Sequence, residues 1–324
     1  MNLLGGIAQN NFLLIGRAGM DFCPDPPGTK TRDASHFVAD LGGSAANTAA
    51  GLVKLGSKAS LVTSVSADPV GDFCLNKLDH YGVERTYVKR VGGEARNSLA
   101  VYESILEDHE TVIYRNGAAD FVFTNEDIDE VPFQDYSAVI TAGTVFAAEP
   151  SRSAAFHGLE RARDAGLPII FDVDYRPYSW PSPKVAEEVL SKAADLSDMI
   201  VGNDEEFGFM AGGVDKGLDK ARALARANAT IVIYKMGEKG AITITKDGEI
   251  QTGIYRTEAL KPTGAGDSFM AGLLASLASG HDLHNSVLRG SACAAITVSG
   301  PMCAPSMPTT KQLETFLTSH PGAA

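Results

Sequence analysis

The fold is indicated most clearly by one stretch late in the sequence, Lys261-Pro262-Thr263-Gly264-Ala265-Gly266-Asp267-Ser268-Phe269. An Ala- and Leu-rich run follows it as far as Gly280, as expected of a helix that ends at a glycine. Glycine lets the backbone turn sharply and approach a ligand closely. The unpaired N–H groups of a first helical turn attract an anion. The backbone from about Gly264 to Asp267 therefore predicts a cradle for a phosphate group.

Asp267 has two interpretations. A carboxylate in a first helical turn complements the helix dipole and contributes roughly 0.3–1 kcal/mol. A carboxylate beside a bound phosphate is a general base that removes the proton of the attacking hydroxyl. The pattern Gly-x-Gly-Asp alone favours the first interpretation. Other parts of the sequence have to decide between them.

Short apolar runs alternate along the chain with amphipathic or Ala-rich stretches. The runs lack a period of two, which is typical of strands covered on both faces in a parallel sheet. The expected strands are Phe12–Ile15, Ser60–Val65, Ala138–Thr141, Ile169–Val173, Met199–Val201 and Ile231–Tyr234. Three of the expected helices stop before a glycine, namely Ala45–Leu55, Val70–Tyr81 and Ser153–Ala165. The sequence thus predicts an α/β fold with a doubly wound, mainly parallel sheet flanked by helices.

Two stretches interrupt this alternation. Residues 21–41 are polar and rich in proline, and residues 97–115 are expected to form two strands around the charged turn Glu107–Glu110. Together they predict a small β lid over one edge of the sheet. The sequence shows no linker, low-complexity run or internal repeat, so we expect one domain over residues 1–324 with the lid as an insertion.

Composition narrows the class of protein. The net charge of −12 argues against a binder of duplex nucleic acid, although a local cluster of arginines can still attract an anionic substrate. The four cysteines are scattered without a Cys-x-x-Cys pair, which fits a reducing compartment. The apolar start has no basic segment before it, and no apolar run is long enough for a membrane span. We expect a cytoplasmic protein without membrane or nucleic-acid partners.

Two segments together resemble a known family. The stretch Thr263–Asp267 resembles the C-terminal signature of the PfkB, or ribokinase-like, carbohydrate kinases. The stretch Leu41–Ala49 is similar to the N-terminal signature of that family, Gly-Gly-x-x-x-Asn-x-Ala. Two signatures in the right order and at the right separation are far more specific than either alone. The resemblance covers essentially the whole chain.

The resemblance implies roles for individual residues. Asp267 is expected to be the catalytic base, with the amides of residues 264–267 as the anion hole for the transferred phosphate. Gly43 and Asn47 are expected to contact the substrate. The pair Lys261-Pro262 stands where the family more often has an acidic residue and threonine. The resemblance therefore does not decide whether the protein binds a monovalent cation.

A second helix start carries Asn203 and Glu206, three positions apart at the end of an expected strand. Such a pair forms a capping arrangement in many α/β folds. The resemblance adds a second role, because Asn-x-x-Glu in that family organises Mg2+ and the phosphates, often through water. Mg2+ prefers a few oxygen ligands and keeps several waters. Both roles are compatible with the same two residues.

The nucleotide is expected to be ATP. The sequence has neither a Walker A motif nor a strand-linked Gly-x-Gly-x-x-Gly, which excludes a P-loop kinase and argues against a dinucleotide dehydrogenase. The stretch Tyr234–Ala241 ends a strand in a glycine turn and by itself indicates a hairpin. The family has a similar turn beside the nucleotide, so the resemblance implies Lys235 and Gly237 as ATP neighbours.

The substrate is expected to be an acid. Three arginines follow strands or the lid, namely Arg17, Arg115 and Arg176. Open α/β sheets bind ligands at the carboxyl ends of their strands, and arginine is the usual partner of a carboxylate. Together with Asp21 and Asn47, which suit hydroxyl groups, they predict a site for a sugar acid.

A narrower resemblance rests on residues 114–120 and 172–180 and on the Lys261 variant of the catalytic loop. These segments are similar to the 5-dehydro-2-deoxygluconokinases of myo-inositol catabolism, which implies phosphorylation of the 6-hydroxyl of 5-dehydro-2-deoxy-D-gluconate. A 2-keto-3-deoxygluconate kinase and a fructokinase-like enzyme are the alternatives within the fold.

Two alternatives belong to other classes. A non-catalytic sugar or nucleotide sensor would keep the pocket but could lose the base, whereas Asp267 is present. His281 and His284 have a spacing that suits a metal, but the sequence offers no third ligand. Some relatives dimerise through the lid, so a homodimer is a further expectation.

Overall fold

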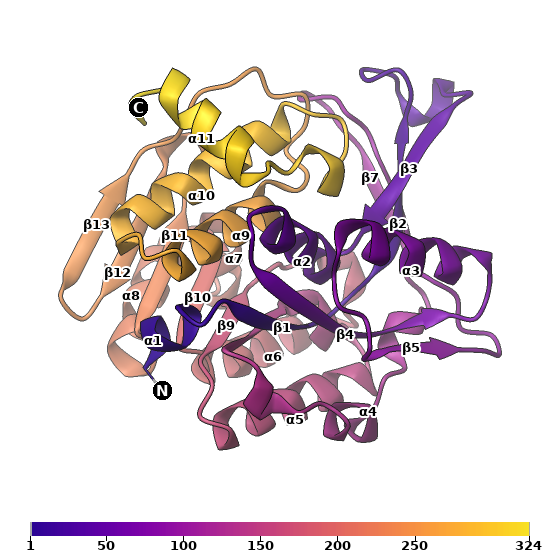
Figure 1. The fold of residues 1–324 in the computed structure, drawn as a ribbon, viewed down its shortest axis with the longest axis horizontal. Coiled ribbons are helices and arrows are strands. Elements are labelled where there is room, and N and C mark those ends of the chain that lie inside the picture. Colours follow the sequence, from indigo (N-terminus) through magenta and orange to yellow (C-terminus); the bar gives the residue numbers. More distant parts are fainter. Residues whose placement is uncertain (1, 324) are drawn as a thin grey trace.

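The computed structural model describes residues 2–323, and a nine-stranded sheet forms its centre (Figure 1). The strands of this sheet are β1 (Asn11–Ile15), β4 (Lys58–Ser66), β5 (Val88–Val91), β8 (Ala138–Ala142), β9 (Ile169–Asp172), β10 (Met199–Asn203), β11 (Ile231–Lys235), β12 (Ala241–Thr245) and β13 (Gly248–Thr252). Their order is β13-β12-β11-β10-β9-β8-β1-β4-β5. All neighbours from β11 to β5 are parallel, whereas β12 and β13 add an antiparallel edge. The expected mainly parallel sheet is confirmed.

Helices cover both faces of this sheet (Figure 1). One face carries α4 (Asn125–Asp129), α5 (Ser151–Asp164), α6 (Pro183–Asp195), α7 (Asp204–Met210) and α8 (Gly217–Ala227). The other carries α1 (Leu3–Ile7), α2 (Ser44–Lys54), α3 (Pro69–Tyr81) and α9 (Ala265–Ala278), with α10 (Leu283–Val298) packed beside α9 and α11 (Thr310–Ser319) against α10. In β1, Leu13 and Ile15 enter the first core, and Phe12 and Leu14 enter the second. Burial on both faces explains the continuous apolar runs in the sequence.

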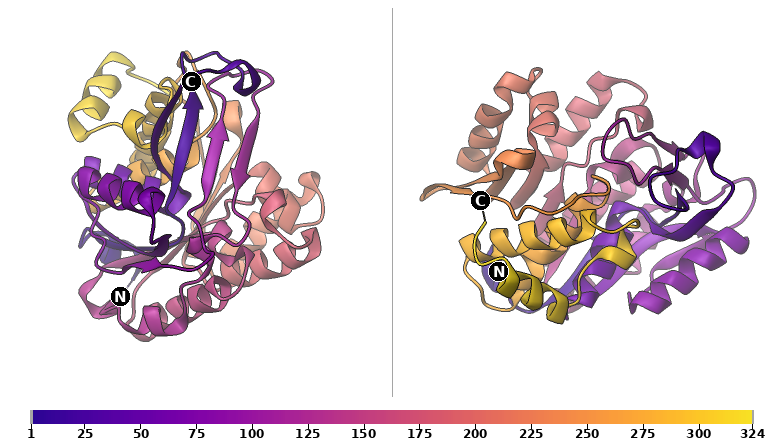
Figure 2. Two further views of the ribbon diagram at one scale, coloured as in Figure 1. Left: turned by 90° about the vertical axis from the view of Figure 1, so that its right-hand side faces the viewer. Right: turned by 90° about the horizontal axis from the view of Figure 1, so that it is seen from above.

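A separate four-stranded sheet, which we call the lid, rises beside the main sheet (Figure 2). It contains β2 (Gly19–Pro24), β3 (Phe37–Gly42), β6 (Leu99–Tyr102) and β7 (Thr111–Tyr114) in the order β3-β2-β6-β7. The hairpin β6–β7 forms around the charged turn, as the sequence predicts. The strands of the polar stretch pair with each other and, through β2, with β6. The two interrupting stretches therefore meet in one sheet.

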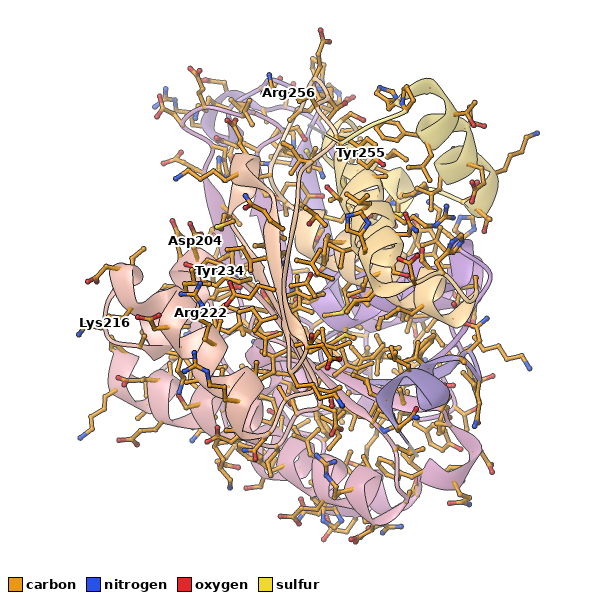
Figure 3. The ribbon with its side chains drawn as sticks, turned by 90° about the vertical axis from the view of Figure 1, so that its left-hand side faces the viewer. Asp204, Lys216, Arg222, Tyr234, Tyr255 and Arg256 are labelled. Carbon is orange, nitrogen blue, oxygen red and sulfur yellow. The ribbon has the colours of Figure 1, made fainter. Side chains whose placement is uncertain are left out.

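The chain between β13 and α9 has no regular secondary structure and passes over the C-terminal helices (Figure 3). Tyr255 in this connection packs edge-on against Phe316 of α11, with ring centroids 5.7 Å apart. The connection leads directly into the loop before α9, so these contacts help to fix where that helix begins. Among residues 2–323, no helix combines the length and apolar character needed to cross a bilayer.

Candidate active site

A cavity of about 680 Å3 opens at the carboxyl ends of the central strands. The end of β1, the ends of β9, β10 and β11, the start of α9 and the inner face of the lid all contribute to its walls. The chain leaves β1 toward β4 on one side and later returns through β8 on the other side. A reversal of this kind leaves a crevice where open α/β sheets bind ligands. Every residue that the sequence analysis places in the site lines this cavity, with the exception of Arg115.

The start of α9 presents backbone amides to the cavity. Gly264 precedes the helix with φ of 84°, and a Cβ at this position would lie 2.8 Å from Sγ of Cys303. Only glycine satisfies both the left-handed backbone and this close contact. Within residues 2–323, the N–H groups of Gly264, Gly266 and Asp267 donate to no backbone carbonyl. They are free to bind an anion at the positive end of the helix dipole.

Asp267 lies in the first turn of α9, half-buried in the cavity wall. Nδ2 of Asn47 donates a hydrogen bond of 3.1 Å to one carboxylate oxygen, which leaves the other oxygen for a ligand. Burial raises the pKa of Asp267 to about 6, the charge of Asp174 adds to the shift, and Asn47 opposes it. The carboxylate is thus ionised at neutral pH but more basic than an ordinary aspartate.

The carboxylates of Asp172, Asp174 and Glu206 line the same cavity as this base. Burial raises the pKa of Asp172 to about 8, the ammonium of Lys235 opposes the shift, and the charge of Glu206 adds to it. Burial also opposes the charge on Asp174, but Arg176 and nearby hydroxyls hold its pKa below the usual range. Both aspartates lie in the segment 172–180, but the sequence alone assigns them no role. Their position at the carboxyl end of β9 is the feature of the sequence that could have indicated a role.

Asn203 and Glu206 form the predicted capping arrangement at the start of α7. Oδ1 of Asn203 accepts from N–H of Glu206 and Oε2 of Glu206 accepts from N–H of Asn203, both at 2.8 Å. Burial raises the pKa of Glu206. In the part of the chain that the structure describes, no group of three or more His, Cys, Asp or Glu side chains could hold a metal ion. His281 and His284 therefore belong to no such group.

Lys235 lies at the end of β11, with its ammonium over the start of α9. A Cβ placed on Gly266 would be 3.6 Å from Nζ of Lys235. Gly237 follows in the turn that links β11 to the antiparallel strand β12, so the hairpin expected from the sequence is present. The cation and the free amides of α9 therefore face the same part of the cavity.

Another part of the cavity wall is formed by residues at the end of β1, in the lid and at the start of α2. Nη1 of Arg17 donates to Oγ of Ser98 at 2.9 Å, and burial raises the pKa of Asp21 to about 7 against the charge of Arg17. Gly43 has φ of 100°, and a Cβ there would lie 2.3 Å from the carbonyl oxygen of Arg17. Buried Oδ1 atoms of Asp21 and Asn47 have no hydrogen-bond partner among the described residues. Buried acceptors without partners are rare and indicate an absent donor.

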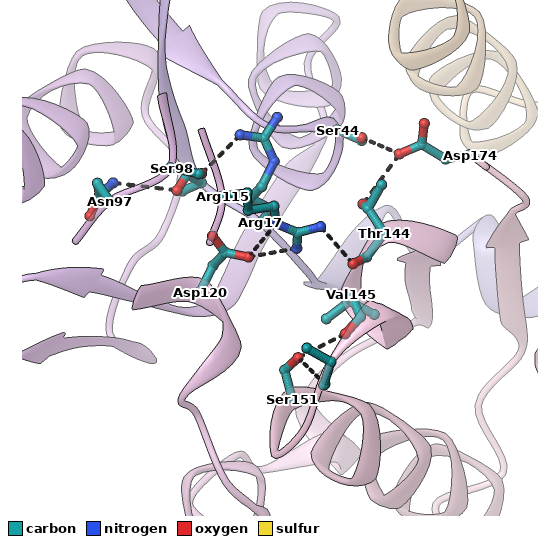
Figure 4. A network of polar contacts seen from close by, with 12 residues as sticks. Arg17, Ser44, Asn97, Ser98, Arg115, Asp120, Thr144, Val145, Ser151 and Asp174 are labelled. Atoms are coloured by element: carbon teal, nitrogen blue, oxygen red, sulfur yellow. Dashed lines mark hydrogen bonds and ion pairs between the residues drawn. The ribbon is translucent and has the colours of Figure 1, made fainter. Parts of the chain in front are cut away.

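Arg176 and Arg115 have different surroundings. Nη2 of Arg176 lies 2.8 Å from Oδ1 of Asp174, and the half-exposed side chain lines the cavity. Arg115 is buried: Nη2 binds Oδ2 of Asp120 at 2.6 Å and Nη1 donates to the carbonyl of Thr144 at 2.8 Å (Figure 4). The structure therefore does not bring Arg115 to the substrate cavity as the sequence analysis expects. Its link to the site is indirect, because the hydroxyl of Thr144 donates to Asp174 at 3.3 Å.

Known proteins resemble this chain over most of its length. Residues 9–310 match the family described as pfkB family carbohydrate kinase. A 5-dehydro-2-deoxygluconokinase of Photobacterium profundum is 37% identical over 311 residues, which is 94% of each chain. One of the same name from Geobacillus kaustophilus is 33% identical over 96% of this chain and 94% of its own. The crystal structure of a fructokinase with bound ATP from Xylella fastidiosa superposes with a TM-score of 0.84 at 21% identity, covering 96% of this chain and 99% of that one. The chain therefore belongs to the pfkB family of carbohydrate kinases, enzymes that transfer phosphate from ATP to a sugar hydroxyl.

Proposed function

We propose that this kinase transfers the terminal phosphate of ATP to the 6-hydroxyl of 5-dehydro-2-deoxy-D-gluconate, a step of myo-inositol catabolism. The observation that carries the proposal is one cavity that holds a raised-pKa base at a helix N-terminus together with the arginines Arg17 and Arg176. A base beside free amides suits phosphoryl transfer. Guanidinium groups in the same cavity suit a substrate with a carboxylate. Both relatives described above are 5-dehydro-2-deoxygluconokinases, which points to the same acid.

Asp267 is the proposed base. Its free carboxylate oxygen accepts the proton of the substrate hydroxyl as that oxygen forms a bond to the terminal phosphorus of ATP. The bond from this phosphorus to the bridging oxygen breaks, and ADP leaves with the electron pair. The amides of Gly264, Gly266 and Asp267 donate to the phosphate oxygens, where negative charge has to be stabilised.

Asp21 and Asn47 are proposed to bind the sugar hydroxyls. Their unpartnered Oδ1 atoms are acceptors, and a hydroxyl donates to an acceptor of this kind. Gly43 keeps the chain close to Arg17 and leaves room beside these groups. A substrate with several hydroxyls would satisfy atoms that the protein leaves unpaired.

The carboxylate of the substrate is proposed to bind Arg176 and Arg17. Arg176 uses Nη2 for Asp174 and Nη1 for the carbonyl of Tyr175, and Arg17 uses one nitrogen for Ser98. A guanidinium has five N–H donors, so both side chains retain donors for an anion. Arg115 is not part of this proposal, since it is buried against Asp120 and Thr144 and does not line the cavity.

Lys235 and Gly237 are proposed to bind the nucleotide, and Asn203 and Glu206 to organise Mg2+. The capping bonds use one lone pair of each oxygen, so the fit to Mg2+ is through water molecules rather than as a protein cage. Asp172 and Glu206 have raised pKa values, mainly because they are buried, and a cation beside them would favour their ionised forms. Mg2+ on the nucleotide supplies charge neutralisation at the phosphates.

A coupled assay of ADP release tests the proposal. The purified protein is given ATP, Mg2+ and, in turn, 5-dehydro-2-deoxygluconate, 2-keto-3-deoxygluconate and fructose. We expect the largest kcat/KM for the first compound. A preference for 2-keto-3-deoxygluconate would move the assignment to another sugar acid, and a preference for fructose would refute an acid substrate. Binding of sugar and ATP without ADP release would indicate a sensor.

A further inference from the structure

Lys261 is an unusual residue, because its side chain is 0% exposed in a loop at the active site. Lysine is almost never fully buried unless its charge has partners. Both hydrogen bonds of Nζ go to backbone carbonyls, to Thr263 at 2.6 Å and to Thr297 at 3.4 Å. Carbonyl oxygens in a dry site are also the ligands by which proteins coordinate a potassium ion.

The first carbonyl shares its peptide unit with an N–H group of the proposed anion hole. Thr263 shares a peptide unit with Gly264, and this unit is trans. The C=O and N–H of a trans peptide point in opposite directions. A bond that holds the Thr263 oxygen toward Lys261 therefore directs the N–H of Gly264 away from Lys261. Gly264 itself borders the cavity.

The second carbonyl lies at the negative end of a helix. Thr297 is in the last turn of α10, where carbonyls of the helix dipole attract a cation. The backbone N–H of Lys261 also donates to Val298 at 3.3 Å. One ammonium thus joins the loop before α9 to the end of α10, which packs alongside α9.

Nearby groups stabilise the charge of this ammonium. Burial lowers the pKa of Lys261, whereas the negative charges of Asp267 and Asp21 oppose this shift. The partners of the positive charge are therefore the two backbone carbonyls, the negative end of α10 and these two carboxylates.

We propose that the ammonium of Lys261 is a built-in cation that takes the place of an exchangeable monovalent ion and orients the anion hole. The residues at this position do not fit a separate ion, because Nζ already holds the two carbonyls. Lys261 is a positioning residue, since it acts on phosphate through the peptide of Gly264. The inference rests on the proposed role of that amide, but not on the identity of the sugar.

Two variants and one control test this inference. Lys261→Met removes the charge, and the double variant Lys261→Asp/Pro262→Thr restores the residues more common in the family. Lys54→Met is the matched control, because Nζ of Lys54 also donates to two carbonyls, Ala304 and Pro305, each at 3.0 Å, but outside the cavity. Each protein is assayed in tetramethylammonium, potassium and ammonium chloride at equal ionic strength. Turnover, Tm and ATP affinity by calorimetry are recorded.

We expect wild type and Lys54→Met to have the same turnover in all three salts. The double variant should lose roughly 10- to 100-fold in tetramethylammonium, as for other groups that orient a catalytic shell, and regain activity in potassium or ammonium. Its Tm and ATP affinity should rise with the same two ions. Lys261→Met should lose activity without recovery, because its apolar side chain still fills the site.

Two results would overturn the inference. One is saturable activation of the wild type by potassium, which requires no variant to fold. The other is a folded double variant whose turnover, Tm and ATP affinity are equal in all three salts. If the wild type does not phosphorylate the proposed sugar acid but Tm and ATP affinity of the double variant still respond to potassium, the proposed substrate fails and the inference stands.

Discussion

Asp267 has to be ionised to accept a proton, and its surroundings set the pH at which this occurs. Burial and the charge of Asp174 raise its pKa from 3.8 to about 6. Below that pH the carboxyl is protonated and cannot act as a base. We therefore expect kcat/KM to fall as the pH decreases through about 6, rather than near 4, in a pH–rate profile of the wild type.

Asp267→Asn provides the companion measurement. We expect kcat to fall by roughly 10²–10⁴, the usual contribution of a general base. The folded pKa of Asp267 lies above its unfolded value, so ionisation reduces stability as the pH rises through this range. The variant should therefore have an equal or higher Tm at pH 7.5. Near wild-type turnover with normal ATP binding would exclude Asp267 as the base.

Arg176 and Arg115 are expected to respond differently to truncation. Arg176→Ala should raise the activation free energy that corresponds to kcat/KM for the sugar acid by about 2–4 kcal/mol, since a carboxylate would lose its charged partner. Fructose turnover should stay nearly unchanged. Arg115→Leu should instead lower the free energy of unfolding by about 3–5 kcal/mol, because Asp120 keeps a buried charge without its partner. Chemical denaturation separates the two effects. Equal losses on acid and fructose in Arg176→Ala would argue against a carboxylate contact.

A substitution of Glu206 distinguishes its role in capping α7 from its proposed role in organising Mg2+. Glu206→Gln keeps an oxygen for the N–H of Asn203 but loses the charge. We expect a higher Mg2+ concentration at half-maximal rate, with little change in sugar KM. A fall in Tm alone, with an unchanged Mg2+ titration, would leave the cap as the role of this residue.

At the scale of elements, the start of α9 is the part on which the account depends most. Gly264→Ala would strain a left-handed backbone by about 1–2 kcal/mol and bring its Cβ within 2.8 Å of Cys303. Displaced amides should reduce kcat by roughly 10²–10³. Gly280→Ala is the control, because Gly280 has φ of 86° after the same helix but no atom within 4 Å of its Cβ. It should lose stability only, as judged by Tm and kcat together.

Central strands could be predicted from the sequence, whereas edge strands could not. β1 and β8 to β11 are buried on both faces and therefore appear as uninterrupted apolar runs. In β5 the exposed Lys89 and Arg90 separate two partly buried valines, and β13 is exposed except at its last residue, so no apolar run indicates either strand. An edge strand is defined by its neighbour rather than by its own composition. For the same reason the sequence indicates the turn between β11 and β12 but not the antiparallel strand β13 that follows.

At the scale of the molecule, the site is assembled from contacts across the whole chain. Asn47 and Asp267, one from each signature, are 220 positions apart and share a hydrogen bond, so the two signatures do meet. Arg115 and its partner Asp120 stand in one segment of the sequence, but the sequence does not show whether the guanidinium turns to Asp120 or to a ligand. Nor does it show the burial of Lys261. Pairing and burial depend on the folded surroundings, which a local motif does not contain.

Dimerisation through the lid stays a prediction. Phe37 and Val38 of β3 and Tyr114 of β7 are exposed apolar side chains on the two outer strands of the lid. Sedimentation of the purified protein, with and without a charged residue in place of Val38, would measure whether a second copy binds there.

The most direct test of the central claim is identification of the product. The protein is incubated with ATP, Mg2+ and 5-dehydro-2-deoxygluconate, released ADP is quantified, and the sugar product is assigned by phosphorus and proton NMR. We predict one equivalent of ADP for each sugar phosphate, with the phosphate on the 6-hydroxyl and the carboxylate intact. ADP release without a sugar phosphate, or phosphate on another oxygen, would contradict the proposed kinase activity.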